Sequence, residues 1–212
     1  PGFVANRLGV TWIQLGVLKA LEQGLTVEQA DAVMGKPFGI PKTGIFGLID
    51  LVGLDLMPHI GASLKSSLPD GDMFHETNRD LPLVNKMIAD GYTGRKGKGG
   101  FYRLNREGGQ KIKEAIDLGS GRYRTSSKAE IGALKPARKP RQVMEIDGPI
   151  GRYALGVMAN TLSYAASLVG DAADDIAAID EVMRLGYNWR WGPFELVDMI
   201  GAPWLVARMR EE

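Results

Sequence analysis

The stretch Gly44-Ile-Phe-Gly-Leu-Ile-Asp-Leu-Val-Gly53 returns near the end of the chain as Gly192-Pro-Phe-Glu-Leu-Val-Asp-Met-Ile-Gly201. Gly, Phe, Leu, Asp and Gly keep the same spacing in both copies, and Asp31-Ala-Val-Met34 likewise returns as Asp180-Glu-Val-Met183. Apolar residues at three- and four-residue steps surround these motifs, a spacing typical of helices. Two copies are too few for a solenoid, so the pattern predicts a tandem duplication of one helical unit.

A long apolar helix is expected before each copy, over residues 3–23 and about 150–169, with Gly24 and Gly170 as the C-terminal stops. Thr26 followed by Gln29 forms a capping box that starts a shorter helix. Helical spacing resumes over residues 45–68, where Pro58 is expected to kink or split the helix.

Alternation of apolar and polar residues over a length sufficient for a sheet is not found, so the sequence predicts an all-α fold. The predicted division is a first helical repeat over 1–102, a basic linker over 103–147 and a second helical repeat over 148–212. Gly-, Ser- and Pro-rich composition supports the linker.

Composition excludes several classes of protein. In the 212 residues, 44% are hydrophobic and 24% charged, as in ordinary globular chains. No apolar run is long enough to span a membrane, and no signal peptide is recognisable. Because the chain has no cysteine, disulfides and thiolate sites are excluded, and a cytoplasmic protein is expected.

The net charge of +1 conceals a basic segment, residues 95–141, with fourteen Lys and Arg against four Asp and Glu. This segment is either a solvated linker face or a surface that faces an anion. Nucleic acid is a poor candidate because the segment has few aromatic residues and no recognised binding motif.

The sequence contains no motif that by itself indicates a catalytic or cofactor-binding site. No dinucleotide or phosphate-loop fingerprint is present, and His59 and His75 are sixteen residues apart without a paired carboxylate. Asp50 and Asp198 lie at equivalent places in apolar helices. Buried carboxylates need hydrogen bonds, so each is expected to hold the preceding Gly-rich loop. The alternative is a pair of catalytic carboxylates.

Three motifs in order do resemble a known family: Pro1-Gly-Phe-Val-Ala-Asn-Arg-Leu8, then Phe38-Gly-Ile-Pro41 leading into Gly44–Gly53, then Gly94-Arg-Lys-Gly-Lys-Gly-Gly-Phe-Tyr102. They are similar to the C-terminal region of 3-hydroxyacyl-CoA dehydrogenase. The duplication resembles the long multifunctional form of bacterial fatty-acid β-oxidation, in which a dehydrogenase and an enoyl-CoA hydratase share one polypeptide.

The resemblance implies an N-terminal Rossmann domain, absent from this chain, that binds NAD and carries a catalytic His–Glu pair. The chain is therefore expected to be a fragment that is inactive alone, with no cofactor or metal of its own. Its helices would close over the acyl-CoA substrate, support oligomerisation and supply one polar side chain. The implied partners are the Rossmann domain and a hydratase domain of the same polypeptide.

By match to the family's Asn-Arg-Leu motif, that side chain is Asn6. A carboxamide can donate a hydrogen bond to the substrate's C3 oxygen without adding charge. The alternative is that Asn6 caps the first long helix.

In the family, this loop borders the acyl chain. Its sequence here differs from the usual family motif, because Lys42-Thr43 replaces one Met and Ile45 replaces a Pro. Chain-length preference is therefore left open. The candidate substrate contacts in this loop are Pro41, Gly44 and Phe46, although Phe46 is equally suited to the core.

Lys96 and Lys98 are further candidates, because cations in a Gly-rich turn can meet the phosphates of CoA. The alternative is a tight turn that anchors Phe101 and Tyr102 in the core.

Two other functions stay open. One is a purely structural module, in which the second repeat imitates a dimer partner and docks a hydratase domain without touching substrate. The other is the helical domain of a different NAD-dependent enzyme, of the 6-phosphogluconate dehydrogenase type. The Asn6-Arg-Leu8 opening and the Gly100-Phe-Tyr102 turn argue against the latter.

Overall fold

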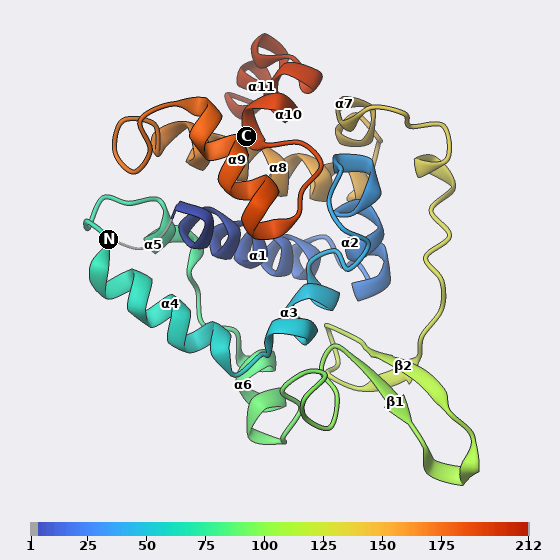
Figure 1. Ribbon diagram of the computed structural model, residues 1–212. Helices are drawn as coiled ribbons and strands as arrows, with labels where there is room; N and C mark the ends of the chain where they lie inside the picture. Colours follow the sequence, from blue (N-terminus) through green and yellow to red (C-terminus); the bar gives the residue numbers. More distant parts are fainter. Residues whose placement is uncertain (1–3, 212) are drawn as a thin grey trace.

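The computed structural model describes residues 4–211 and is built around two long helices (Figure 1). These helices, α1 (Val4–Glu22) and α8 (Pro149–Ser167), head the two repeats and pack against each other in the core. Twelve of the nineteen residues of α1 are buried, which explains why its apolar positions surround the helix instead of forming one stripe. The all-α prediction is confirmed for the bulk of the molecule.

The first repeat continues from α1 through short helices. They are α2 (Val27–Val33), a 3₁₀ turn η1 (Lys36–Phe38), α3 (Phe46–Val52), α4 (Leu56–Ser67), α5 (Phe74–Thr77) and α6 (Pro82–Ala89). The capping box is confirmed, since Gln29 N donates to Thr26 Oγ1 and Thr26 N donates to Gln29 Oε1. Gly24 ends α1 with a φ of 64°, a left-handed conformation that suits glycine.

The helix expected over residues 45–68 is split, but at Gly53 and not at Pro58. Gly53 has a φ of 116°, and the axes of α3 and α4 meet there at 92°. Pro58 instead lies in the first turn of α4. Backbone N–H groups in the first turn make no hydrogen bond within the helix, so a proline there does not break it. Within residues 4–211, no single helix is long and apolar enough to cross a membrane; α3 and α4 pass that test only together, as a bent pair.

The segment expected to be a linker carries a small antiparallel sheet. Its elements are β1 (Tyr102–Asn105), η2 (Glu107–Gly109), β2 (Ile112–Ile116) and β3 (Tyr123–Thr125), followed by η3 (Gly132–Leu134) and α7 (Pro140–Met144). Tyr102 pairs with Ala115, and Ile116 pairs with Tyr123. The expectation that no sheet forms was wrong. These strands have only three to five residues, and the longest of them, β2, does not alternate, so periodicity does not detect the sheet.

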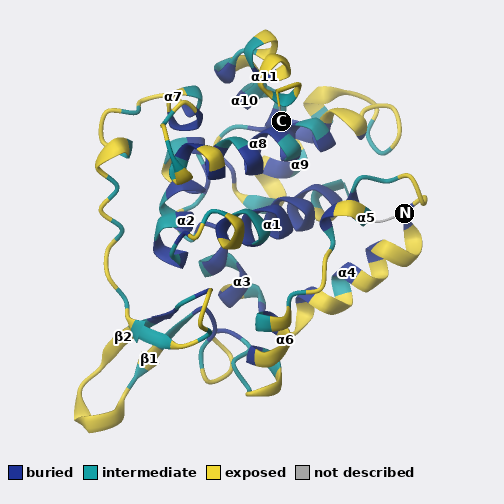
Figure 2. Ribbon diagram, turned by 180° about the vertical axis from the view of Figure 1, so that it is seen from behind, coloured by how far each residue is buried: buried dark blue, intermediate teal, exposed yellow. Residues whose placement is uncertain are grey.

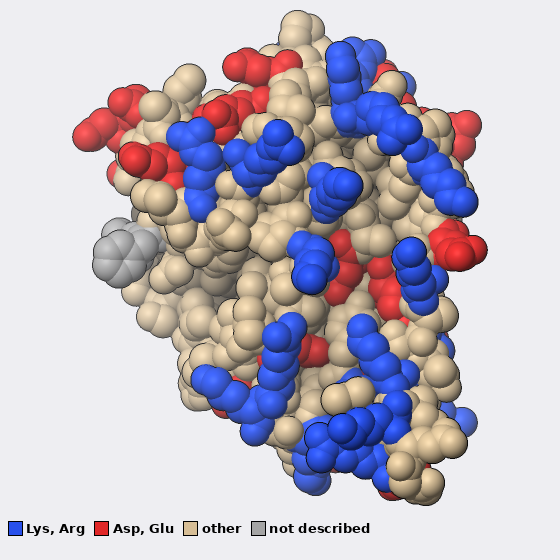
Figure 3. All heavy atoms as spheres, turned by 45° about the vertical axis from the view of Figure 1, so that its right-hand side comes forward, with Lys and Arg blue, Asp and Glu red and all other residues tan. Residues whose placement is uncertain are grey.

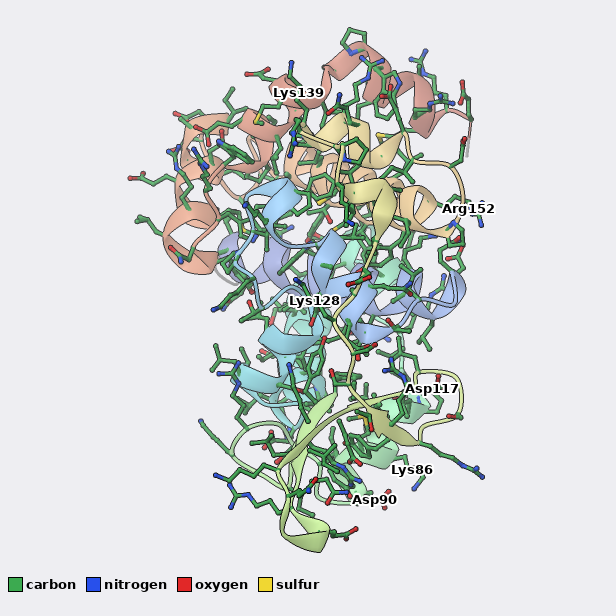
Figure 4. The ribbon with its side chains drawn as sticks, turned by 90° about the vertical axis from the view of Figure 1, so that its right-hand side faces the viewer. Lys86, Asp90, Asp117, Lys128, Lys139 and Arg152 are labelled. Carbon is green, nitrogen blue, oxygen red and sulfur yellow. The ribbon has the colours of Figure 1, made fainter. Side chains whose placement is uncertain are left out.

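After the sheet, the segment from β3 to α7 runs along the length of the molecule and leads to the second repeat. Figure 4 shows Asp117 near the sheet, Lys128 beside the first repeat and Lys139 at the far end. The second repeat then comprises α8, α9 (Ile176–Tyr187), α10 (Pro193–Ile200) and α11 (Ala202–Met209). The exact boundaries 102/103 and 147/148 stay a prediction.

Aromatic side chains fill the contact between the repeats. Trp12 is fully buried and packs edge-on against Trp189, with ring centroids 5.2 Å apart. Gly9 is required here, because a Cβ on it would lie 1.9 Å from Cζ of Tyr187. Figure 2 shows α1 and α8 buried, whereas α4 and the β1–β2 hairpin have exposed faces.

Candidate functional site

Asn6 lies in the first described turn of α1, and its side chain is exposed. The backbone is already helical at Val4, so Asn6 is not at the N-cap, and the capping alternative is wrong. Residues 1–3 of the Pro-Gly-Phe opening lie outside the described residues. The exposed carboxamide has two N–H donors and one acceptor available to a ligand. Its catalytic role stays a prediction.

The next residue, Arg7, is a buried arginine that is only 3% exposed. Its guanidinium forms an ion pair with Asp72 and donates from Nη1 to Asp171 Oδ2 at 3.1 Å. Nε donates to the hydroxyl of Tyr164 at 3.3 Å. We call Arg7, Asp72, Tyr164 and Asp171 the Arg7 cluster.

Asp72 is well supplied with donors inside this cluster. Its Oδ1 accepts hydrogen bonds from Phe74 N and from the Tyr164 hydroxyl, both at 2.8 Å. Burial disfavours the ionised carboxylate, but these bonds and the charge of Arg7 outweigh it and hold the pKa of Asp72 below its usual value. Burial is likewise outweighed at Arg7, whose pKa is raised by Tyr164 and the two carboxylates. The pair therefore stays ionised.

The Arg7 cluster joins three parts of the fold. Arg7 belongs to α1, Asp72 to the loop before α5, and Tyr164 and Asp171 to α8 and the loop that follows it. Figure 1 shows the start of α1 beside α5 and the α8–α9 region. The second repeat thus helps to hold the helical turn that carries Asn6.

The loop before α3 places its three candidates differently. Pro41 is partly exposed, whereas Phe46 is completely buried and packs edge-on against Phe101 at 4.7 Å. Gly44 has a φ of 60°, and a Cβ there would lie 2.4 Å from the Asp31 backbone. Close packing therefore explains Gly44, and Phe46 has a core role. Substrate contact by these residues stays a prediction.

Asp31 is the carboxylate that holds this loop, and its role is duplicated. It accepts hydrogen bonds from Phe46 N at 2.7 Å and Gly47 N at 3.1 Å, and Asp180 does the same for Phe194 N and Glu195 N in the second repeat. Asp31 also accepts from the Tyr102 hydroxyl at 2.8 Å. Burial outweighs these bonds and raises the pKa of Asp31 to about 7.

The expectation for Asp50 and Asp198 needs correction. Asp50 is buried and accepts from Phe101 N at 2.7 Å and Tyr102 N at 2.8 Å, so it holds the following Gly-rich turn and not the preceding loop. Asp198 is exposed. In the first repeat, the Gly94–Tyr102 turn covers the helix face on which Asp50 lies. The second repeat has no such turn, so the equivalent face, with Asp198, is exposed to solvent.

The Gly94–Tyr102 turn is a tight anchor that also displays cations. Gly94 N donates to Gly99 O at 2.8 Å, and a Cβ on Gly100 would lie 2.0 Å from Oδ1 of Asp50. Lys96 and Lys98 are exposed, and Lys98 Nζ donates to Asp90 O at 3.0 Å.

Beside this turn is a hollow of about 610 Å³ lined by basic residues, namely Arg95, Lys98, Arg103, Arg106 and Lys113. Figure 3 shows Lys and Arg gathered over this end of the molecule. The hollow is open to solvent and has the charge that an anionic ligand requires. The turn therefore anchors Phe101 and Tyr102 through Asp50, and contact of Lys96 and Lys98 with the phosphates of CoA stays a prediction.

An apolar groove lies between α1, α4 and α6. Its floor is formed by buried or partly buried apolar side chains and its rim by exposed polar ones such as Lys65, Arg79 and Asp80. The volume is about 270 Å³. Sequence analysis missed this groove, because the same apolar spacing indicates a filled core.

The residues present do not fit a dinucleotide. The one sheet within residues 4–211 is antiparallel, and no strand in it leads through a Gly-rich turn into a helix, the arrangement that holds a pyrophosphate. Among the same residues, no group of three or more His, Asp or Glu side chains is arranged to hold a metal ion.

Comparison with known proteins decides the family. The family model for the 3-hydroxyacyl-CoA dehydrogenase C-terminal domain matches residues 2–104 and 153–211. The chain belongs to the 3-hydroxyacyl-CoA dehydrogenase family. The two matched segments fit the duplicated unit, which is also visible in the paired contacts of Asp31 and Asp180.

Individual 3-hydroxyacyl-CoA dehydrogenase relatives agree. A Rickettsia felis protein named as a fatty acid oxidation complex trifunctional enzyme is 39% identical over 93% of this chain and 27% of its own length. A Bacillus subtilis protein named as a 3-hydroxyacyl-CoA dehydrogenase is 34% identical over 95% of this chain and 26% of its own. This chain therefore spans about a quarter of the length of these relatives.

A solved structure shows the same fold. The crystal structure of 3-hydroxybutyryl-CoA dehydrogenase from Escherichia coli superposes with a TM-score of 0.62, covering 97% of this chain and 54% of the other. At 18% identity this likeness concerns the fold alone.

Proposed function

We propose that this chain is the substrate-closing helical part of an enzyme that oxidises 3-hydroxyacyl-CoA to 3-oxoacyl-CoA with NAD in fatty-acid oxidation. The observation that carries the proposal is an exposed carboxamide, Asn6, held on the first turn of a buried helix by the Arg7 cluster. Fixing the backbone turn that carries this donor before substrate arrives reduces the entropy that is lost on binding. The names of the relatives support the reaction.

In this mechanism the residues of the chain bind and orient the substrate. Asn6 donates an N–H to the C3 oxygen of the substrate, which limits rotation about C3 and stabilises charge that develops on that oxygen. NAD would be held by a nucleotide-binding domain of the complete polypeptide and would accept the hydride that leaves C3. A base of that domain would take the hydroxyl proton, so the substrate would lose two electrons and two protons in total.

Replacing Asn6 by alanine tests the proposal in the complete dehydrogenase polypeptide. We expect kcat to fall at least tenfold, as on loss of a transition-state donor. The melting temperature should not change, because the Asn6 side chain is exposed on the surface of the helix. Gln110→Ala, which removes an exposed amide elsewhere, is the control and should retain wild-type kcat. A wild-type kcat in Asn6→Ala would contradict the proposed role.

Lys96 and Lys98 are proposed to attract the phosphates of CoA to the basic hollow. Changing both to glutamine should raise KM for the acyl-CoA about two- to fivefold at low salt, with kcat unchanged, because exposed ion pairs are individually weak. Lys135 and Lys139 are both exposed, and Lys139 lies near the opposite end of the molecule (Figure 4), so changing these two lysines to glutamine is a control that removes the same charge. If both double variants have the same KM, the two lysines only stabilise the turn.

The rival proposal is a structural module whose second repeat takes the place of a dimer partner. Its support is the direct packing of α1 on the equivalent helix α8. Titration of the complete polypeptide with acetoacetyl-CoA separates the two proposals. A spectral shift of the Asn6 side-chain amide on binding favours the active site, and no shift favours the module.

A further inference from the structure

We propose that a second hollow in the first repeat binds a ligand that carries a diphosphate group. This hollow has a volume of about 720 Å³ and lies between α2, the loop before α3, the strand β2 and the segment after β3. Four cations line it, each from a different segment of the chain: Lys42, Arg95, Lys113 and Lys128. We call it the Lys42 hollow. The inference does not depend on the proposed function.

The cations of the Lys42 hollow are available to a ligand. In the described part of the chain, none of the four side chains forms an ion pair or a hydrogen bond with another residue. Lys113 Nζ lies 4.9 Å from the centre of the Tyr102 ring, a contact that uses none of its N–H donors. Cations that converge on a concave surface raise the local potential and concentrate anions there.

Three carboxylates also line the hollow, but protein donors already occupy them. Glu28 is paired with Arg124 at 2.7 Å, and Asp31 and Asp50 accept the hydrogen bonds described above. Burial raises the pKa of Asp31 to about 7 and that of Asp50 to about 6, so Asp31 is about half protonated at neutral pH. The four cations therefore outnumber the negative charges, and the hollow has an excess of positive charge.

Two walls of the hollow are fastened to the same helix, α2. Glu28 accepts a hydrogen bond from Ser126 Oγ at 3.1 Å, which fixes the segment that carries Lys128. Figure 4 shows Lys128 on this segment beside the first repeat. Asp31 likewise holds the start of α3, just after Lys42. Binding therefore orders side chains and little backbone, which lowers its entropic cost.

The size of the hollow selects the class of ligand. A volume of about 720 Å³ corresponds to about 24 water molecules and lies within the range of small-molecule pockets. A single phosphate is far smaller and cannot meet cations on four segments at once. Two linked phosphates with an attached organic group fill the space, and each phosphate accepts charge-assisted hydrogen bonds from Lys and Arg. The hydroxyl groups of Thr43 and Ser127 also line the hollow and add neutral donors.

Calorimetric titration of the complete polypeptide with inorganic pyrophosphate tests the site. We expect Lys42→Gln with Lys128→Gln to weaken pyrophosphate binding about tenfold, because two charge-assisted contacts are lost. Lys42→Arg with Lys128→Arg keeps both charges and should stay within about threefold of wild type. Arg95 and Lys113 are left unchanged, because they also line the basic hollow beside the Gly94–Tyr102 turn. Pyrophosphate taken up by any other domain is common to all variants, so the difference between them reports the Lys42 hollow.

The control is Lys135→Gln with Lys139→Gln, which removes the same charge outside the hollow and should leave the affinity within about twofold. Equal weakening by the two glutamine pairs shows attraction to net positive charge alone and overturns the inference. Absence of saturable binding by the wild-type polypeptide overturns it as well. Orthophosphate should bind about tenfold more weakly than pyrophosphate, and equal affinities contradict the diphosphate assignment.

The diphosphate group can belong to the acyl-CoA or to a separate ligand such as a nucleoside diphosphate, and steady-state kinetics distinguish these sources. A raised KM for the acyl-CoA in the Lys42→Gln, Lys128→Gln variant supports the site and assigns the group to the substrate. An unchanged KM with weakened pyrophosphate binding supports the site and assigns a separate ligand, and ADP should then compete with pyrophosphate. An inactive wild-type polypeptide contradicts the proposed function and not the hollow, which the titration tests by itself.

Discussion

Replacing Arg7 by methionine is expected to lower the free energy of unfolding by about 3 to 5 kcal/mol, because a buried carboxylate loses its partner. Asp72 is 6% exposed at its side chain and would keep only its bonds from Phe74 and Tyr164. The change should also lower kcat in the complete enzyme, since the turn that carries Asn6 loses its attachment to the second repeat. Chemical denaturation and steady-state kinetics measure the two effects.

Arg141→Met is the matched control, because Arg141 pairs with Glu145 on an exposed helix surface and should cost less than about 1 kcal/mol. Removing the stranded charge as well, in Arg7→Met with Asp72→Leu, should recover part of the stability but not kcat. A loss below about 1 kcal/mol in Arg7→Met alone would contradict the assigned role of the Arg7 cluster.

Replacing Asp31 by alanine is expected to cost about 3 to 5 kcal/mol, because three donors lose their acceptor: Phe46 N, Gly47 N and the Tyr102 hydroxyl. The second repeat supplies the comparison. Asp180→Ala removes the same helix-start contact but strands only two donors, so about 2 kcal/mol is expected. Equal losses would show that the Tyr102 bond contributes nothing.

The same residue predicts a pH dependence that Asp31→Asn tests. Burial raises the pKa of Asp31 to about 7, well above its usual value of 3.8, so its contribution is complete below pH 4 and is lost as the pH rises through 7. Wild-type stability should therefore fall by a few kcal/mol between pH 5 and pH 8. Burial raises the pKa of Asp50 to about 6 with the same sign, so Asp31→Asn should keep only a smaller decline. An unchanged slope would contradict the assignment.

Local signals in the sequence predicted much of the helical framework. The two long helices, their glycine stops and the Thr26–Gln29 box depend on residues within a few positions of each other, so periodicity and capping chemistry are sufficient to find them. The break at Gly53 was misplaced at Pro58, because a proline in the first turn of a helix is compatible with it.

Contacts between residues far apart in the chain could not be predicted from such local signals. Asp31 was noticed only as part of a repeated motif, and its partners lie 15, 16 and 71 residues away. Asp50 and Asp198 were treated as equivalent, yet only Asp50 is covered by the Gly-rich turn. Arg7 was seen as part of a family motif, with no signal that three distant residues would bury it.

The order of residues by itself determined a duplicated set of helices, because helix periodicity and the spacing of repeated motifs are properties of neighbouring positions. Its motifs also resemble those of the 3-hydroxyacyl-CoA dehydrogenase family, which the comparison with the family model confirmed. Only the tertiary structure decided which carboxylates are buried, that Arg7 joins the two repeats, and that an open apolar groove lies between α1, α4 and α6. Burial, ion pairing and the space between helices depend on segments that are far apart in the chain and meet only when it folds.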